Sequence, residues 1–79
     1  MTDELLSQVR QAWLDVLGLE EVPLDVNFFE TGGNSLLLII LHGELSSLAS
    51  RELQIADLYR SNTVLSQAQL LAQEGAKNP

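Results

Sequence analysis

Cysteine is absent from this 79-residue sequence, and histidine occurs once. The absence of cysteine excludes disulfide bonds, thiolate metal sites and a catalytic thiol. One imidazole cannot build a metal cluster unaided. The length is that of one domain, so we predict a single domain over residues 1–79 whose stability comes from packed apolar side chains.

Basic residues are scarce. Four lysine and arginine residues stand against eleven acidic residues, which gives a formal net charge of −7. Without a basic patch to displace counterions, we expect no binding to nucleic acid. The acidity can serve solubility or attract basic surfaces of partner proteins, and composition does not separate the two.

Long hydrophobic runs are also missing. The longest apolar run has six residues, 36–41, whereas a membrane-spanning helix needs about 20. The amino terminus is acidic and lacks the pattern of a signal peptide. We therefore expect a cytoplasmic protein without a membrane segment.

Leucine is abundant and alone outnumbers valine, isoleucine and threonine together, a balance that favours helix over strand. The apolar spacing predicts an all-α fold of three main helices plus one short helix, with a long first loop. The expected elements are a helix over 3–17, a loop over 18–34, a helix over 35–48, a short helix over 55–60, a helix over 63–73 and a frayed tail over 74–79.

Each predicted helix has an apolar face that should point into the core. The clearest is the stripe at Leu38, Leu41, Leu45 and Leu48 in the second helix. The remaining expected core positions are Leu6, Val9, Trp13, Val16 and Leu17 in the first helix, Leu58 with Ile55 and Tyr59 as further candidates in the short helix, and Val64, Ala68 and Leu71 in the last. If Trp13 is buried, its indole N–H needs a hydrogen-bond partner.

The long loop and the start of the second helix do not fit a simple surface pattern. The loop carries the apolar residues Leu24, Val26, Phe28 and Phe29, so we expect it to be anchored to the core. Leu36, Ile39 and Ile40 fall off the core stripe of the second helix. They form surplus apolar surface of the kind that binds partners.

Ser35 opens the second helix after Gly32, Gly33 and the helix-capping residue Asn34. Gly33 should let the chain turn sharply into the helix. Ser35 can be an ordinary helix-start residue, a hydrolase nucleophile or a serine that another enzyme modifies.

A nucleophile elbow requires glycine two residues after the serine, where this chain has Leu37. His42, the sole possible imidazole base, would lie roughly 10 Å farther along the helix. These two features argue against a hydrolase. A phosphate ester, by contrast, suits an exposed hydroxyl at the positive end of a helix.

Two stretches carry a family resemblance. The sequence DVNFFETGGNSL, residues 25–36, closely resembles the phosphopantetheine attachment motif of peptidyl carrier proteins, the thiolation domains of nonribosomal peptide synthetases. The sequence RELQIADLYRSNTVLSQAQLLA, residues 51–72, is similar to the third and fourth helices of that family.

The resemblance implies a four-helix acyl-carrier-like bundle, and a carrier rather than an enzyme. Ser35 would receive 4′-phosphopantetheine from coenzyme A through a phosphopantetheinyl transferase, with Gly32, Gly33 and Asn34 shaping the turn. The arm's thiol would hold an aminoacyl, peptidyl or acyl group as a thioester. The implied partners are an adenylation or other loading enzyme and condensation, tailoring or thioesterase enzymes of nonribosomal peptide and antibiotic biosynthesis, acting on a monomeric carrier.

The chain departs from the family pattern at three positions. Ile40 stands where synthetase domains often have a basic or polar residue, so we expect Leu36, Ile39 and Ile40 to form an apolar docking surface. Asn62 replaces a common proline and Gln67 a common apolar residue, changes that we expect to affect only the last helix.

Two other functions remain open. One is an acyl carrier for polyketide or fatty-acyl groups, and the other is a helical adaptor that carries no cargo. The carrier could be free-standing or a domain of a larger synthetase.

Overall fold

Helices account for all the regular structure in the computed structural model of the chain, which describes residues 3–49 and 52–76. The described residues form four α-helices, α1 (Asp3–Leu17), α2 (Ser35–Ser46), α3 (Ile55–Arg60) and α4 (Val64–Ala76), and a 3-10 helix, η1, over Phe28–Thr31. No strand occurs within the described ranges. The prediction of an all-α fold with three main helices and one short helix is confirmed.

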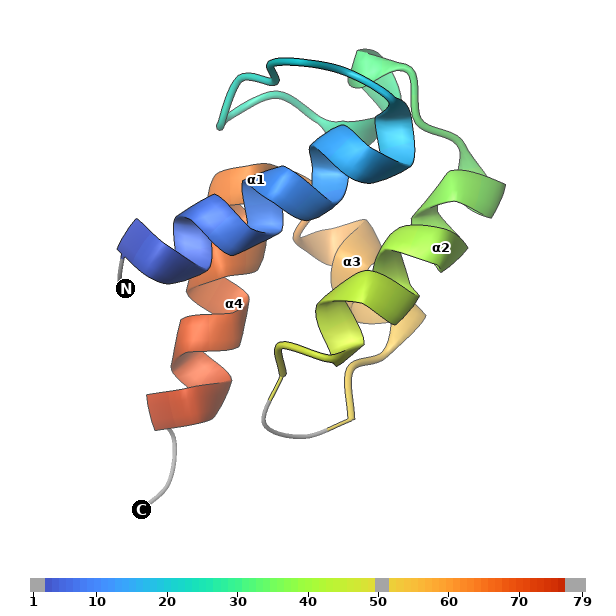
Figure 1. Cartoon of the computed structure of the whole chain (residues 1–79). Helices are drawn as coiled ribbons and strands as arrows, with labels where there is room; N and C mark the ends of the chain where they lie inside the picture. The colour runs from blue at the N-terminus through green and yellow to red at the C-terminus, as the bar shows by residue number, and fades with distance from the viewer. Residues whose placement is uncertain (1–2, 50–51, 77–79) are drawn as a thin grey trace.

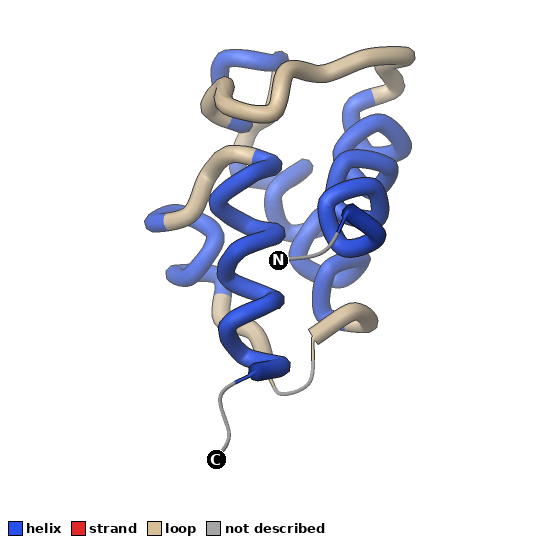
Figure 2. The backbone as a smooth tube through the Cα atoms, turned by 90° about the vertical axis from the view of Figure 1, so that its left-hand side faces the viewer, coloured by secondary structure: helices blue, strands red, loops and turns tan. Residues whose placement is uncertain are grey.

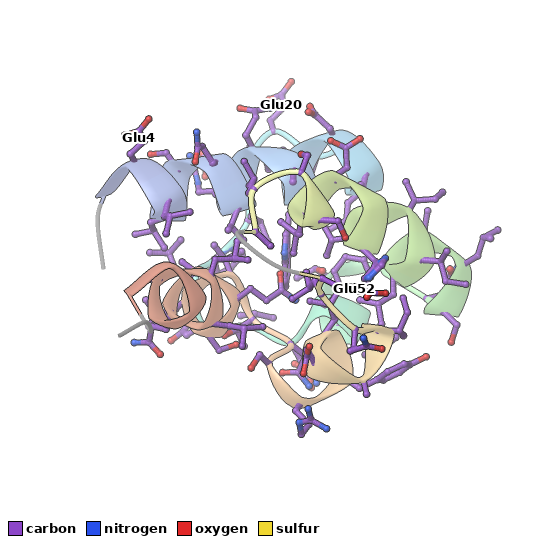
Figure 3. The ribbon with its side chains drawn as sticks, turned by 90° about the horizontal axis from the view of Figure 1, so that it is seen from below. Glu4, Glu20 and Glu52 are labelled. Atoms are coloured by element: carbon purple, nitrogen blue, oxygen red, sulfur yellow. The ribbon has the colours of Figure 1, made fainter. Side chains whose placement is uncertain are left out.

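The helices enclose a single core. α1 packs against both α2 and α4, and α3 packs against α2. The long loop and η1 close one end of this bundle, at the top of Figures 1 and 2. Acidic side chains such as Glu4 and Glu20 point outward, as Figure 3 shows.

Most of the predicted inward positions are buried. The residues of the core are Val9, Ala12, Trp13, Val22, Phe28, Leu38, Leu41, Leu45, Leu53, Leu58, Val64, Ala68 and Leu71. Leu48, Leu6, Val16 and Leu17 are half-buried and pack against it. Tyr59 was a candidate for the core, but it is 48% exposed, because Leu58 fills the inward position of the short helix α3.

The core contains one fully buried polar side chain among the described residues, that of Gln67. Its Oε1 accepts a hydrogen bond of 2.8 Å from the indole Nε1 of Trp13, and its Nε2 donates one of 2.9 Å to the carbonyl of Ser61. Gln67 therefore joins α4, α1 and the turn after α3. The expectation that this departure from the family pattern affects only the last helix is wrong.

The long loop is anchored at two points to the junction between α3 and α4. The N–H of Phe28 donates to the carbonyl of Asn62 (2.8 Å), and the N–H of Leu65 donates to the carbonyl of Leu24 (3.0 Å). Asn62 thus supports the loop through its carbonyl, which a proline would also provide. Within the loop, Val22 and Phe28 enter the core, whereas Leu24, which we expected there, is 36% exposed.

Several element boundaries differ from the sequence prediction. The loop over 18–34 contains η1. α2 ends at Ser46 rather than at residue 48, because the Ser47 hydroxyl donates to the carbonyl of Glu44 and competes with the helical pattern (2.8 Å).

α4 begins one residue later than predicted and runs to Ala76, so residues 74–76, predicted as tail, are helical. Glutamate and alanine are good helix formers, and one glycine near the end does not stop the helix. Residues 77–79 of the predicted tail lie outside the described residues.

Candidate functional site at the start of helix α2

The turn before α2 is built around the ring of Phe28. Asn27 caps η1 by accepting a hydrogen bond from the N–H of Phe29 (2.8 Å), and Gly32 ends η1 with a φ of 104°. That backbone conformation favours glycine. Gly32, not Gly33, is therefore the residue that turns the chain sharply.

Position 33 requires glycine for a different reason. A Cβ atom at this position would lie 2.3 Å from Cε2 of Phe28, far inside van der Waals contact. Because Phe28 is fully buried, moving its ring would disturb the packing of the core. The absence of a side chain at Gly33 lets the backbone pass directly over the ring and bring Asn34 and Ser35 to the surface.

Asn34 caps α2 as predicted. Its backbone is extended (φ −145°, ψ −177°), and its side chain accepts a hydrogen bond from the N–H of Leu37 (2.9 Å). The N–H of Leu38 binds the carbonyl of Asn34 (2.9 Å). The N–H groups of Ser35 and Leu36 precede the first helical hydrogen bond and so have no acceptor within α2.

Ser35 is exposed as the first residue of α2. Its Oγ lies 3.3 Å from the hydroxyl of Tyr59 in α3, a contact that the sequence analysis missed. No acidic residue occupies the first turn of α2. The hydroxyl, the two free N–H groups and the positive helix end together fit a phosphate ester, whose negative charge they would stabilise.

His42 does not serve Ser35. Its Nε2 is hydrogen-bonded to the carbonyl of Leu53, and its ring is half-buried. Because a carbonyl can only accept, this nitrogen carries the proton. The residue that a serine hydrolase would need as its base instead connects α2 to the segment before α3.

The three residues predicted as surplus apolar surface are exposed. Leu36, Ile39 and Ile40 have exposed fractions of 67%, 56% and 48%. Spacings of three and four residues place them on one side of α2, beginning next to Ser35. We call these three residues the apolar patch.

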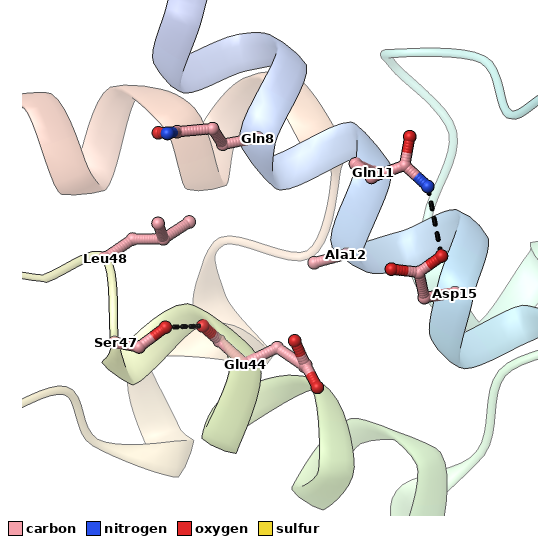
Figure 4. Close-up of a pocket in the computed structure, with 7 residues that line it drawn as sticks. All are labelled: Gln8, Gln11, Ala12, Asp15, Glu44, Ser47 and Leu48. Carbon is pink, nitrogen blue, oxygen red and sulfur yellow. Dashed lines mark hydrogen bonds between the residues drawn. The ribbon is translucent and has the colours of Figure 1, made fainter.

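The far end of α2 carries a different feature. A groove runs between α1 and the end of α2, as Figure 4 shows. Its lining is Gln8, Gln11, Ala12, Asp15, Glu44, Ser47 and Leu48. From Ser35 to Ser46 the helix axis advances about 16 Å, so the groove is separate from the serine. In the described part of the chain, no cluster of three or more histidine, cysteine, aspartate or glutamate residues could hold a metal.

The arrangement of helices is that of acyl and peptidyl carrier proteins. One solved structure with this arrangement is BlmI, a type-II acyl carrier protein from Streptomyces verticillus involved in bleomycin biosynthesis (TM-score 0.82, 26% identity, covering 89% of this chain and 84% of that one). Another is a nonribosomal PCP domain (TM-score 0.74, 27% identity, covering 89% and 90%).

The model of the phosphopantetheine attachment site family matches residues 7–71. The chain belongs to this family, whose members carry phosphopantetheine as a covalent prosthetic group. The predicted resemblance to peptidyl carrier proteins is thereby confirmed.

Curated relatives are much longer proteins. The hybrid PKS-NRPS synthetase ucsA of an Acremonium species is 39% identical over 70 residues, which cover 84% of this chain and 2% of the synthetase. Indigoidine synthase of Dickeya dadantii (strain 3937) is 40% identical over 57 residues, which cover 72% of this chain and 4% of that protein. The chain thus spans only a few per cent of these relatives.

Proposed function

We propose that Ser35 is the phosphopantetheine attachment point, and that the chain carries an aminoacyl, peptidyl or acyl group in nonribosomal peptide or related biosynthesis. The observation that carries this proposal is the exposed Ser35 hydroxyl on the first residue of α2, beside two free backbone N–H groups. Gly32, Gly33 and Asn34 present it by turning the chain over the Phe28 ring. The bound arm supplies a terminal thiol, which this cysteine-free chain lacks, and that thiol holds the cargo as a thioester.

Attachment needs coenzyme A and a phosphopantetheinyl transferase. Ser35 Oγ forms a bond to the phosphorus that bears the pantetheine arm, and the bond from that phosphorus to the adenosine bisphosphate of coenzyme A breaks. The serine proton passes to a base of the transferase, since His42 is hydrogen-bonded elsewhere. Carrier domains are generally not catalytic, and we propose the same for this chain.

The apolar patch of Leu36, Ile39 and Ile40 is the proposed docking surface for the enzymes that load and unload the arm. It lies on the same helix as Ser35 and starts at the adjacent residue, so an enzyme that reaches the serine also meets the patch. Apolar anchors at the centre of an interface often provide much of its binding energy. The partners would be an adenylation or other loading enzyme, and condensation, tailoring or thioesterase enzymes.

The location, the cargo and the oligomeric state of the carrier are less closely defined. No helix in residues 3–49 and 52–76 is long and apolar enough to cross a membrane. The similarity to hybrid PKS-NRPS synthetases keeps an acyl or polyketide cargo as the second candidate. A cytoplasmic location and a monomeric state stay predictions.

The proposal is tested by mass spectrometry after incubation with coenzyme A and a promiscuous transferase. The wild type should gain one phosphopantetheinyl group, and Ser35→Ala should gain none. Ser7→Ala, which removes an exposed hydroxyl from α1, is the matched control and should be modified like the wild type. An unchanged wild-type mass, with a transferase shown to be active on another carrier, would favour the adaptor function instead.

A further inference from the structure

The hydroxyl of Tyr59 reaches the functional serine from a different helix. Tyr59 lies near the end of α3, and its oxygen is 3.3 Å from Ser35 Oγ. In the described part of the chain, it is the one side chain within hydrogen-bonding distance of that oxygen. The two residues are 24 positions apart in the sequence, so the contact exists only in the folded domain.

The Tyr59 ring is held in place although it is half exposed. It stacks on Phe29 with a centroid distance of 5.9 Å and an interplanar angle of 19°. Phe29 meets Phe28 edge to face at 5.8 Å, and Phe28 meets Trp13 in the same way at 5.0 Å. A continuous row of four aromatic rings therefore connects the core to the tyrosine hydroxyl. Each contact between two rings helps to hold the Tyr59 ring in position.

We propose that Tyr59 is a positioning residue for Ser35: its hydroxyl orients the serine before modification and donates a hydrogen bond to the phosphodiester afterwards. This inference rests on the proposed function, because it takes Ser35 as the attachment point. The proposed docking role of the apolar patch does not depend on the Tyr59 hydroxyl, because docking there relies on apolar side chains.

Counting protons gives the direction of the hydrogen bond in each state. Before modification, either hydroxyl can donate to the other. After Ser35 Oγ has become an ester oxygen it has no proton, so the phenol is the one partner able to donate. Its acceptors are then the ester oxygen and the charged phosphate oxygens, and a hydrogen bond to a charged oxygen is the stronger kind.

The test compares the wild type with Tyr59→Phe, which keeps the ring and its stacking and removes only the oxygen. Single-turnover attachment of the phosphopantetheine arm is measured with saturating transferase and coenzyme A. Ser7→Ala serves as the control for loss of an exposed hydroxyl. We expect the rate constant at saturation to fall about two- to fivefold in Tyr59→Phe, as suits the loss of one partly exposed hydrogen bond. When the excess transferase is titrated, the transferase concentration that gives half the maximal rate should not change, because the docking surface is intact.

Two spectroscopic measurements examine the modified state. Tyr59 is the sole tyrosine, so the intensity ratio of the tyrosine Raman doublet reports on this hydroxyl alone and should shift toward strong donation when the arm is attached. The phosphorus NMR resonance of the modified Tyr59→Phe protein should differ from that of the modified wild type, whereas Ser7→Ala should match it.

The outcomes separate this inference from the proposed function. A wild type that is never modified overturns the function. A modified wild type with an unchanged rate constant in Tyr59→Phe, or a loss that appears only as weaker transferase binding, overturns the positioning role. A Raman ratio and a phosphorus resonance that do not respond overturn the hydrogen bond to the phosphodiester.

Discussion

Replacing Gln67 with leucine should destabilise the domain, even though the carriers that this chain resembles usually have an apolar residue at that position. The substitution removes the acceptor of the Trp13 indole N–H and the donor to the Ser61 carbonyl. Trp13 is fully buried, so its N–H would lose its partner without gaining water. Ser61 is half-buried, and its carbonyl can recover a water molecule.

The magnitude follows from these two environments. An unsatisfied buried group costs about 1–3 kcal/mol, and here the indole accounts for most of it. Leucine offsets part of this cost, because it removes the need to bury an amide. We expect a net loss of about 1–3 kcal/mol, which is a large share of the roughly 5–15 kcal/mol that stabilises a typical domain.

The assay is urea unfolding followed by circular dichroism. Gln69→Leu is the matched control, because Gln69 is an exposed residue of the same helix and such changes usually stay within about 0.5 kcal/mol. In a double-mutant cycle with Trp13→Phe, the two losses should be non-additive by at least about 0.5 kcal/mol. A Gln67→Leu midpoint at or above that of the wild type, together with an additive cycle, would refute the reasoning.

Three further predictions concern the site and the core. Gly33→Ala should lower the stability by about 1–3 kcal/mol through overpacking against Phe28, and it should slow the modification of Ser35. Adding Phe28→Leu to Gly33→Ala should recover part of the lost stability. A Gly33→Ala protein with wild-type stability would show that the ring can move. Ile40→Arg should shift the stability by no more than about 0.5 kcal/mol yet slow loading by the native partner. Leu38→Arg should instead unfold the domain by burying an unpaired charge. Equal melting temperatures for the two variants would contradict the assignment of the buried and exposed faces of α2. Leu41→Ala, at a fully buried position, should cost about 2–5 kcal/mol in chemical denaturation, and a midpoint that barely moves would count against the core assignment.

The sequence was most informative where structure depends on local spacing. The stripe at Leu38, Leu41 and Leu45 was predicted correctly because helical periodicity alone determines which residues share a face. The cap at Asn34 was predictable for a similar reason, since the side chain binds an N–H only three residues away.

Most errors about the core and the site occur where a contact joins distant parts of the chain. The exposure of Tyr59 and its contact with Ser35 depend on how α3 packs, which its short apolar pattern does not specify. The partners of Gln67 could not be assigned, because Trp13 lies 54 residues away. The role of Gly33 was also misjudged, since nothing in the sequence indicates that the Phe28 ring lies beneath it.

The attachment of the long loop has a consequence for how the chain can be shortened. The loop that leads to Ser35 is supported by backbone hydrogen bonds to Asn62 and Leu65, which lie much later in the sequence. A truncated chain that stopped after α3 would retain Ser35, the glycine pair and the apolar patch. It would lose Asn62 and Leu65, which are the partners in the two hydrogen bonds to the loop, as well as α4, against which α1 packs. The smallest fragment that presents the serine correctly therefore includes α4, although the hydrogen bond to the serine side chain comes from α3.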